Sequence, residues 1–169
     1  TMRIEPYIDV PASERGDYNI LLAGYHYGIR HAGMIANYAY KHAGFFRGED
    51  SSLKVANTAM ILDCLYFNEE AGNHIDVPGD KGPFDMEDIA KACADTGTLI
   101  EINDKHAHLT VEEIKIAAKF DVSFIIGSDA HVPEKVGSFE GPLRRALEAG
   151  LDPGRIVNIS LANEGQKEI

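Results

Sequence analysis

Cysteine, basic residues and long apolar runs are all scarce in this 169-residue sequence. The two cysteines, Cys64 and Cys93, lie in apolar, helix-like segments and share no short spacing with each other or with a histidine. We therefore interpret them as buried thiols without a redox or metal-binding role. Lys and Arg number 16 against 27 Asp and Glu, so the formal net charge is −11. This charge argues against a general nucleic-acid or anionic-membrane partner, but it permits a small phosphorylated substrate held by metal ions.

No stretch reaches the roughly 18 consecutive apolar residues of a membrane span, and the N-terminal residues lack the charged-then-apolar pattern of a secretory signal. We therefore expect a cytoplasmic protein without a membrane partner. The composition, with 44% hydrophobic and 25% charged residues, is typical of a globular protein. The chain is long enough to bury a core, and we expect a single domain over residues 1–169.

Strand-like and helix-like segments alternate along the chain, which predicts parallel βα units and hence an α/β fold. Apolar residues at helical spacing indicate the helices, and short unbroken apolar runs such as TLIEI and VSFII indicate the strands. Thr110 followed by Glu113 is a capping-box pair at a helix start. The predicted strands are 2–7, 18–23, 98–103, 123–127 and 156–159. One predicted helix begins near Ser52, and three more cover 86–95, 110–120 and 140–149.

Residues 28–50 interrupt this alternation with a segment rich in Gly, Ala, Tyr and His. We expect a long loop over the active-site face, since extended βα loops carry the substrate contacts of parallel barrels. Their charge and position make Arg30 and Lys41 in this segment, and Lys81 further along, candidates for binding a substrate phosphate. RHAG at Arg30 and KHAG at Lys41 recur, but two copies of four residues are too few to indicate a repeat.

The segment GSDAH, residues 127–131, directly follows the apolar run FII and so lies at the C-terminal end of a predicted strand. Catalytic groups converge at that end in parallel α/β folds. Asp129 supplies a carboxylate oxygen and His131 an imidazole nitrogen, a ligand set that zinc and manganese accept. Taken alone, the pair is explained equally well by a carboxylate that caps a turn and a solvated histidine.

Three further residues hold comparable places. Glu5 follows the first predicted apolar segment, His26 follows the run YNILLA, and His74 precedes a Pro-Gly turn. Each has an ordinary explanation by itself, as a hydrogen-bonded structural histidine or a solvated carboxylate. Together with Asp129 and His131 they have the pattern of a site built from several βα loops. We expect Glu5, His26, Asp129 and His131 to converge at the C-terminal ends of the parallel strands.

These residues and their surroundings resemble the PHP (polymerase and histidinol phosphatase) domain, in particular the histidinol-phosphatase-like phosphoesterases. The resemblance runs from Arg3 to about Ser160, outside residues 28–50. It rests on the segments IEPYI, LLAGYH, NTAMI, GTLIEIN, IIGSDAH and PGRIVNIS, of which the SDAH and EIN elements are the most specific. It implies a distorted (βα)7 TIM-like barrel that holds up to three divalent ions, zinc, manganese or iron, and hydrolyses phosphate esters.

By this resemblance Glu5 would bridge two ions, His26 and His74 would hold the second of them, Asp129 the first and His131 the third. The family's signature also includes a His-x-His pair and two more histidines before the bridging Glu, and none of these precedes Glu5 here. We therefore expect the chain to be the C-terminal two thirds of such a domain.

A second departure concerns His74. The family has an apolar strand that leads directly into His-Pro-Gly, whereas FNEEAGN stands in this region and Val77 comes directly before the Pro-Gly pair. His74 is nevertheless the one histidine available for this ligand position. We expect the remaining histidines on exposed loops: His31, His42, His106 and His108. His106 and His108 follow the EIN strand and could contact substrate.

The expected reaction is metal-assisted hydrolysis of a phosphomonoester such as histidinol phosphate. Asp129 and His131 would be its catalytic residues, and His131, or a histidine in the N-terminal segment expected to be missing, could instead assist proton transfer. One alternative is a phosphodiesterase or exonuclease, which the charge of −11 and the lack of a basic stripe disfavour. A non-catalytic PHP-like module that only binds metal or partners is a further alternative.

We predict that this chain alone is inactive, or nearly so, as a phosphatase. A zinc site needs at least three protein ligands, so the candidates Glu5, His26, His74, Asp129 and His131 cannot complete three sites, although the first three could form one. Without the first strands the barrel would also present an open edge, which favours self-association. The measurement is phosphomonoester hydrolysis with added zinc or manganese, together with a count of bound metal. Full activity with three tightly bound ions would contradict the prediction.

Overall fold

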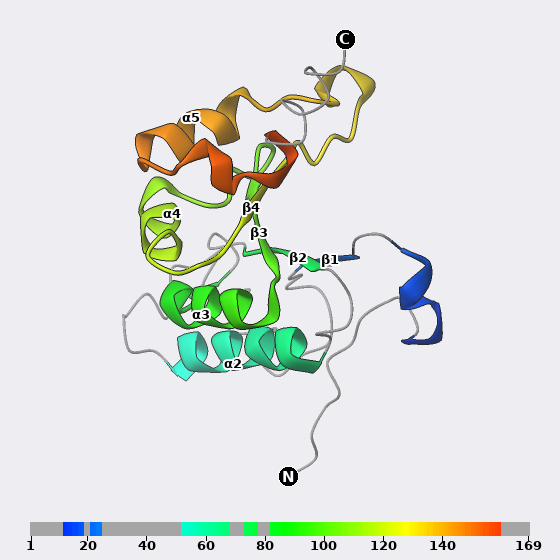
Figure 1. The fold of residues 1–169 in the computed structure, drawn as a ribbon, viewed down its shortest axis with the longest axis vertical. Coiled ribbons are helices and arrows are strands. Elements are labelled where there is room, and N and C mark those ends of the chain that lie inside the picture. Colours follow the sequence, from blue (N-terminus) through cyan, green and yellow to red (C-terminus); the bar gives the residue numbers. More distant parts are fainter. Residues whose placement is uncertain (1–11, 19–20, 25–51, 68–72, 78–81, 160–169) are drawn as a thin grey trace.

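The computed structural model of the chain describes residues 12–18, 21–24, 52–67, 73–77 and 82–159. Within these residues strands and α-helices alternate along the chain (Figure 1). The strands are β1 (Leu21–Gly24), β2 (Asn73–Asp76), β3 (Leu99–Asn103) and β4 (Phe124–Gly127). The helices are α2 (Ser52–Phe67), α3 (Met86–Thr96), α4 (Val111–Ala117) and α5 (Glu140–Glu148). Short 3-10 helices cover Ala12–Asp17, Pro133–Lys135 and Pro153–Arg155.

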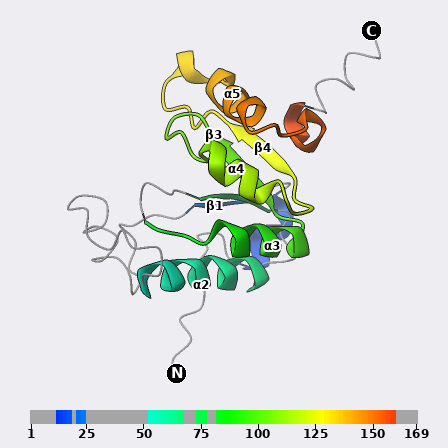
Figure 2. The same ribbon diagram turned by 90° about the vertical axis from the view of Figure 1, so that its left-hand side faces the viewer.

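The four strands form one parallel sheet in the order β1-β2-β3-β4, so neighbours in the sheet are also neighbours in the sequence. The register sets Gly24 beside Asp76 and Asn103 beside Gly127. Helices α2, α3, α4 and α5 follow one another in chain order beside the strands, and each contacts the next (Figures 1 and 2). Because parallel strands are joined by crossover helices, the loops that leave the strands all lie at the same end of the sheet.

Strand β3 is buried on both of its faces. Ile100 and Ile102 point to one face and Glu101 and Asn103 to the other, since side chains alternate along a strand, and all four are buried. The two isoleucines belong to the apolar core between the sheet and the helices, with large contributions from Ile89, Ile114, Phe124 and Ile156. The opposite face of β3 therefore presents buried polar groups, which is where the candidate site lies.

Local signals set the ends of the helices, and the capping box predicted at Thr110 is confirmed. At the start of α4, the Thr110 hydroxyl accepts a hydrogen bond from the Glu113 backbone N–H (3.3 Å), and the Glu113 carboxylate accepts one from the Thr110 backbone N–H (2.8 Å). At the end of α3, Gly97 adopts a left-handed conformation (φ 68°) and donates its N–H to the Cys93 carbonyl. Glycine is favoured there because a Cβ is strained at positive φ.

The cysteines form no disulfide in the described residues, and Cys93 lies within the core, as expected. Burial raises the pKa of the Cys93 thiol to about 12, so it is protonated and unreactive at neutral pH. Cys64 is only partly buried, although burial also raises the pKa of its thiol. None of the described helices has the length and apolar character needed to cross a membrane.

The α/β alternation expected from the sequence is confirmed for the strands β3 and β4 and for the helices α2, α3 and α5, with ends within a residue or two of those predicted. Helix α4 is shorter than predicted because it ends at Ala117. The strand predicted over 18–23 is β1, which begins only at Leu21. Strand β2 was not predicted, and the segments 2–7 and 28–50 lie outside the described residues.

The predicted strand over 156–159 is wrong. Ile156 makes a single parallel bridge to Phe124, and the chain then turns into helical conformation at residues 157–159. The Asn158 side chain takes the place of the missing strand, because its amide accepts from the Ile126 N–H (3.1 Å) and donates to the Ile126 carbonyl (2.8 Å). The apolar pattern of the sequence does not indicate that a side-chain amide pairs with the edge strand in this way.

Arg155 anchors this C-terminal segment, and its replacement tests the anchor. Its guanidinium donates to the carbonyls of Ala118, Phe120 and Val122, and it lies over the Phe124 ring at 5.5 Å. We predict that Arg155→Met lowers the free energy of unfolding by about 1.5–3 kcal/mol, because partly buried carbonyls lose a charged donor. Urea denaturation measures the change.

The matched control is Arg144→Met, since Arg144 is exposed and has a 3.9 Å contact with Glu148. Exposed ion pairs of this kind contribute less than about 1 kcal/mol. An equal effect of the two substitutions would show that Arg155 acts through its charge alone and not through the three carbonyls.

Candidate active site

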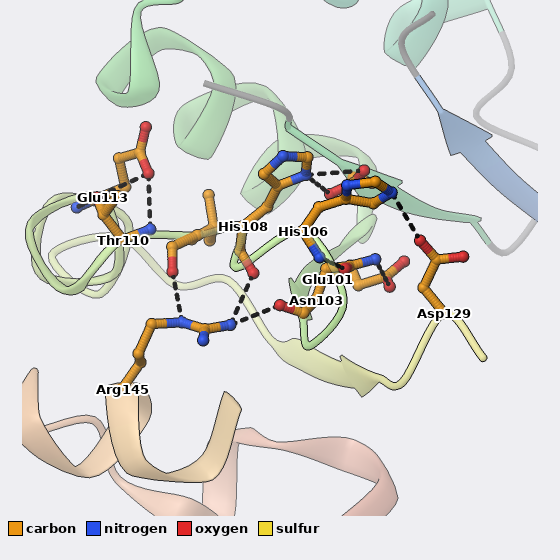
Figure 3. A network of polar contacts seen from close by, with 10 residues as sticks. Glu101, Asn103, His106, His108, Thr110, Glu113, Asp129 and Arg145 are labelled. Atoms are coloured by element: carbon orange, nitrogen blue, oxygen red, sulfur yellow. Dashed lines mark hydrogen bonds and ion pairs between the residues drawn. The ribbon is translucent and has the colours of Figure 1, made fainter. Parts of the chain in front are cut away.

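The site lies where β2, β3 and β4 end. Asp76 is the last residue of β2, Asn103 is the last residue of β3, and Gly127, which pairs with Asn103, is the last residue of β4. The loop Asp104–His108 follows β3, and the turn Ser128–His131 follows β4. These two connections leave neighbouring strands at the same end of the sheet, so their side chains meet there (Figure 3).

Glu101 and Asn103 form the buried floor of the site. Glu101 is 4% exposed, and its carboxylate accepts a hydrogen bond from the Asn103 side-chain amide (3.0 Å). The Asn103 side-chain oxygen in turn accepts from the backbone N–H of His106 (3.0 Å). Gly127 is required beside them, because a Cβ at that position would lie 2.0 Å from Oε1 of Glu101. The glycine of the GSDAH segment therefore makes room for the Glu101 side chain.

Asp129 projects from the turn that follows β4. Its backbone has a left-handed conformation (φ 47°), which Asp tolerates better than most residues. Its Oδ2 lies 3.3 Å from Nε2 of His106, and its backbone carbonyl lies 2.8 Å from Nδ1 of His131. The Asp129 carboxylate therefore has one histidine from the β3 loop on one side and one from its own turn on the other.

His106 and His108 project from the same loop and stack on each other, with ring centroids 5.5 Å apart and an interplanar angle of 20°. His108 is only 4% exposed, and its Nδ1 lies 3.0 and 3.2 Å from the two carboxylate oxygens of Asp76. The expectation that His108 occupies an exposed loop is therefore wrong. A carboxylate on the neighbouring strand binds this imidazole, which lets it be buried within a loop.

Helix α5 holds the β3 loop in place. Arg145 donates hydrogen bonds to the backbone carbonyls of Asn103, His108 and Leu109 (Figure 3). Burial lowers the pKa of the Arg145 guanidinium below its usual range, and the nearby Asp104 carboxylate acts in the opposite direction. The side chain stays charged at neutral pH, since an arginine is not deprotonated in proteins. Three carbonyls at one guanidinium fix the backbone that carries both histidines.

An open cleft of about 350 Å³ lies beside Asp129. Its walls come from the β3 loop and from the residues after β4: Asp104, Lys105, Ser128, Asp129, His131, Val132 and Lys135. The Asp104 carboxylate accepts a hydrogen bond from the Ser138 hydroxyl (3.0 Å) and is thereby held on the wall. The charged residues that line the cleft are thus two lysines and two aspartates.

The structure places the predicted site residues unevenly. Asp129 and His131 lie together at the end of β4, as expected. His74 is the second residue of β2 and not a strand-end residue as expected; Asp76 occupies that end. Two predicted metal ligands, Glu5 and His26, lie outside the described residues. The same holds for the predicted phosphate-binding residues and two further histidines: Arg30, Lys41, Lys81, His31 and His42. Among the described residues no three His, Cys, Asp or Glu side chains form a metal-binding group, so convergence of the full set stays a prediction.

Sequence reasoning missed Asp76 and gave Glu101 no role at the site, and for His106 it offered only a substrate contact. Glu101 carried a readable signal, because a charged residue in the middle of the buried run TLIEI indicates a polar face on that strand. The strand that ends at Asp76 is only four residues long and has no apolar run. The contact of His106 with Asp129 joins loops that are more than twenty residues apart, so only the folded chain reveals it.

Comparisons with known proteins point to the same region. A family model described as PHP-associated matches residues 112–139, which include β4, Asp129 and His131. A probable phosphatase of Syntrophotalea carbinolica is 33% identical over 133 residues, which cover 70% of this chain and 53% of the relative. These matches support a PHP-domain family assignment for the chain. They agree with the resemblance read from the SDAH and EIN segments.

Further relatives of this chain carry the same description. A probable phosphatase of Thermoanaerobacter pseudethanolicus is 32% identical over 114 residues, which cover 60% of this chain and 44% of the relative. A probable phosphatase of Clostridium novyi is 29% identical over 96 residues, or 50% of this chain and 37% of the relative. The chain spans about half the length, or less, of the curated relatives that it matches.

The close approach of Gly127 to Glu101 can be tested by adding one methyl group. Gly127→Ala would place a Cβ 2.0 Å from the Glu101 carboxylate, so the buried side chain must move and disturb its bond with Asn103. We predict a loss of about 1–3 kcal/mol in the free energy of unfolding, as for other overpacked sites. Gly16→Ala is the control, because a Cβ there meets no atom within 4 Å.

A double-mutant cycle locates the cause of this loss. In a Glu101→Ala background the added methyl group has room, and we expect Gly127→Ala to cost less there than in the wild-type chain. Equal costs in the two backgrounds would show that Glu101 is not what requires the glycine.

Proposed function

We propose that the chain is part of a metal-dependent phosphoesterase whose substrate is a phosphomonoester, such as histidinol phosphate or a related small metabolite. The observation that carries the proposal is the Asp129 carboxylate, which lies at the C-terminal end of a parallel strand between two imidazoles and beside an open cleft. Active sites of parallel α/β barrels occupy that end. The similarity to several probable phosphatases supports the reaction class.

The donor atoms at this place fit a divalent ion such as zinc or manganese. Asp129 offers carboxylate oxygens. The Nδ1 of His131 is engaged by the Asp129 carbonyl at 2.8 Å, which makes that nitrogen the N–H donor and leaves the lone pair on Nε2 for a ligand bond. We propose Asp129 and His131 as metal ligands, together with Glu5, His26 and His74. Divalent ions at such a site supply an activated water molecule and positive charge for the phosphoryl oxygens.

The chain's own residues would bind and orient the substrate. Lys105 and Lys135 line the cleft beside Asp129, and neither forms an ion pair with the residues that the structure describes. We propose that they attract and hold an anionic group of the substrate, in addition to Arg30, Lys41 and Lys81. The imidazole of His131 is exposed at the cleft, and as an alternative to metal binding its Nε2 would exchange a proton with the reacting groups.

We also propose that residues 1–169 form one PHP-type domain whose strands are part of a distorted (βα)7 barrel. The parallel strands keep their sequence order, and the helices follow them in the same order. This is the arrangement of consecutive βα units in a barrel. The buried polar face of β3 supports it as well, since that face would line the barrel interior.

Replacement of the Asp129 carboxylate tests the proposed function in the whole protein. We predict that Asp129→Asn lowers kcat/KM for a phosphomonoester at least about 100-fold, since loss of groups that bind or orient a catalytic metal has effects of this order. Asn preserves the shape of the side chain and tolerates the left-handed backbone, so the fold should be retained. Asp121→Asn is the matched control, because Asp121 is an exposed carboxylate on the turn before β4.

The assay compares 4-nitrophenyl phosphate, histidinol phosphate and bis(4-nitrophenyl) phosphate as substrates, with zinc and with manganese. Hydrolysis of the monoesters that depends on Asp129 supports the proposal. Preference for the diester would indicate a phosphodiesterase instead, and equal activity of the Asp129→Asn and Asp121→Asn variants would rule out the role of Asp129.

A further inference from the structure

We propose that His106 binds the same divalent ion as Asp129, so that the loop after β3 contributes a ligand to the metal centre. This inference rests on the proposed metal-dependent function. It adds a residue that follows the EIN segment to a centre otherwise assigned to Glu5, His26, His74, Asp129 and His131. The evidence is the position of the His106 ring relative to the Asp129 carboxylate (Figure 3).

The separation of the two donor atoms fits a shared ion. Nε2 of His106 lies 3.3 Å from Oδ2 of Asp129. Two ligand atoms bound to one zinc ion, with bonds of about 2.0–2.2 Å at tetrahedral angles, lie roughly 3.3–3.5 Å apart. A direct charge-assisted hydrogen bond between imidazole and carboxylate would instead be about 2.7–2.9 Å long. The observed distance therefore lies in the range expected for two ligands on a common ion.

The ring of His106 is held in this position from several sides. Its backbone N–H is bound by the Asn103 side chain (3.0 Å), and its ring stacks on the buried ring of His108. His108 is itself fixed by Asp76, at 3.0 Å. Arg145 binds the backbone carbonyls on both sides of the loop. A ligand whose position is set before the ion arrives loses little conformational entropy on binding, which raises metal affinity.

Stability alone does not explain this arrangement. The His106 and Asp129 side chains are 39% and 31% exposed, and ion pairs that remain this accessible to water contribute little to folding. The same exposure leaves room for an ion and its water molecules. Binding sites commonly have this arrangement: buried residues orient the side chains that bind the ion, and the donor atoms of those side chains face solvent.

Direct observation of the metal–nitrogen bond tests the proposal. The 169-residue chain, labelled with ¹⁵N-histidine, is titrated with ¹¹³Cd²⁺ as the probe metal, and the imidazole ¹⁵N resonances are recorded. We expect ¹¹³Cd to split the Nε2 resonance of His106, which is assigned by its absence in His106→Gln. We also expect His106→Gln to weaken Cd²⁺ binding about 10- to 100-fold, measured by competition with a chelator. The Nδ1 resonance of His108, which Asp76 engages, should stay unsplit.

The Asp129→Asn variant separates this inference from the proposed function. If Cd²⁺ binding depends on Asp129 but the His106 resonance is not split, His106 is not a ligand and the inference is overturned, while the proposed metal centre stands. If no bound Cd²⁺ depends on Asp129, which includes the case in which Asp129→Asn changes nothing, the proposed role of Asp129 as a ligand fails and this inference fails with it. A weaker affinity of His106→Gln without splitting in the wild-type chain would show that His106 only orients Asp129.

Discussion

The amide side chain of Asn103 joins the buried interior of the sheet to the loop that carries the site. Its nitrogen donates to the buried Glu101 carboxylate, and its oxygen accepts from the backbone of His106. A carboxylate as buried as Glu101 is costly unless its hydrogen bonds are satisfied, so the amide must stay in place. The His106 backbone is thereby tied to a position that the core of the domain already requires. The absence of a side chain at Gly127 completes this constraint, since Glu101 fills the space.

Two arginines, Arg145 and Arg155, bind backbone carbonyls of connecting segments at opposite ends of the sheet. Arg145 binds the carbonyls of the irregular loop after β3, near the site, and Arg155 binds those of the connection between α4 and β4. In both places the chain leaves regular structure, where the backbone carbonyls lack the complete hydrogen bonding of a helix or strand, although the His108 carbonyl also accepts from the Asn103 N–H. A guanidinium can satisfy several of them at once because its donors are arranged in a rigid plane. The long side chains of the C-terminal segment thus hold together connections formed earlier in the chain.

The site combines a rigid base with accessible functional groups. Its buried members, Glu101, Asn103 and His108, come from β3 and its loop, whereas Asp129 and His131 remain open to the cleft. The region matched by the PHP-associated family model begins in α4 and extends past the turn that carries Asp129. The matched region therefore contains Asp129 and His131, whereas His106 reaches the same carboxylate from the loop that precedes this region.

The sequence by itself determined much of the order of elements and the place of one pair of site residues. Apolar runs and the Thr110 capping box located β3, β4 and the start of α4, because these features depend on residues close together in the chain. The Asp129 and His131 pair could be found since it directly follows a strand of strong apolar character. The SDAH and EIN segments likewise sufficed to recognise the family.

Tertiary structure alone decided the features that depend on contacts between distant residues. Asn158 replaces a strand by pairing with Ile126, so the apolar run at 156–159 gave a wrong prediction. His108 is buried because Asp76 of another strand binds it, although the loop sequence is polar. His106 meets Asp129 because parallel strands bring their C-terminal ends together. Local patterns record which face of an element is apolar, but they do not record which polar groups from other elements will satisfy one another.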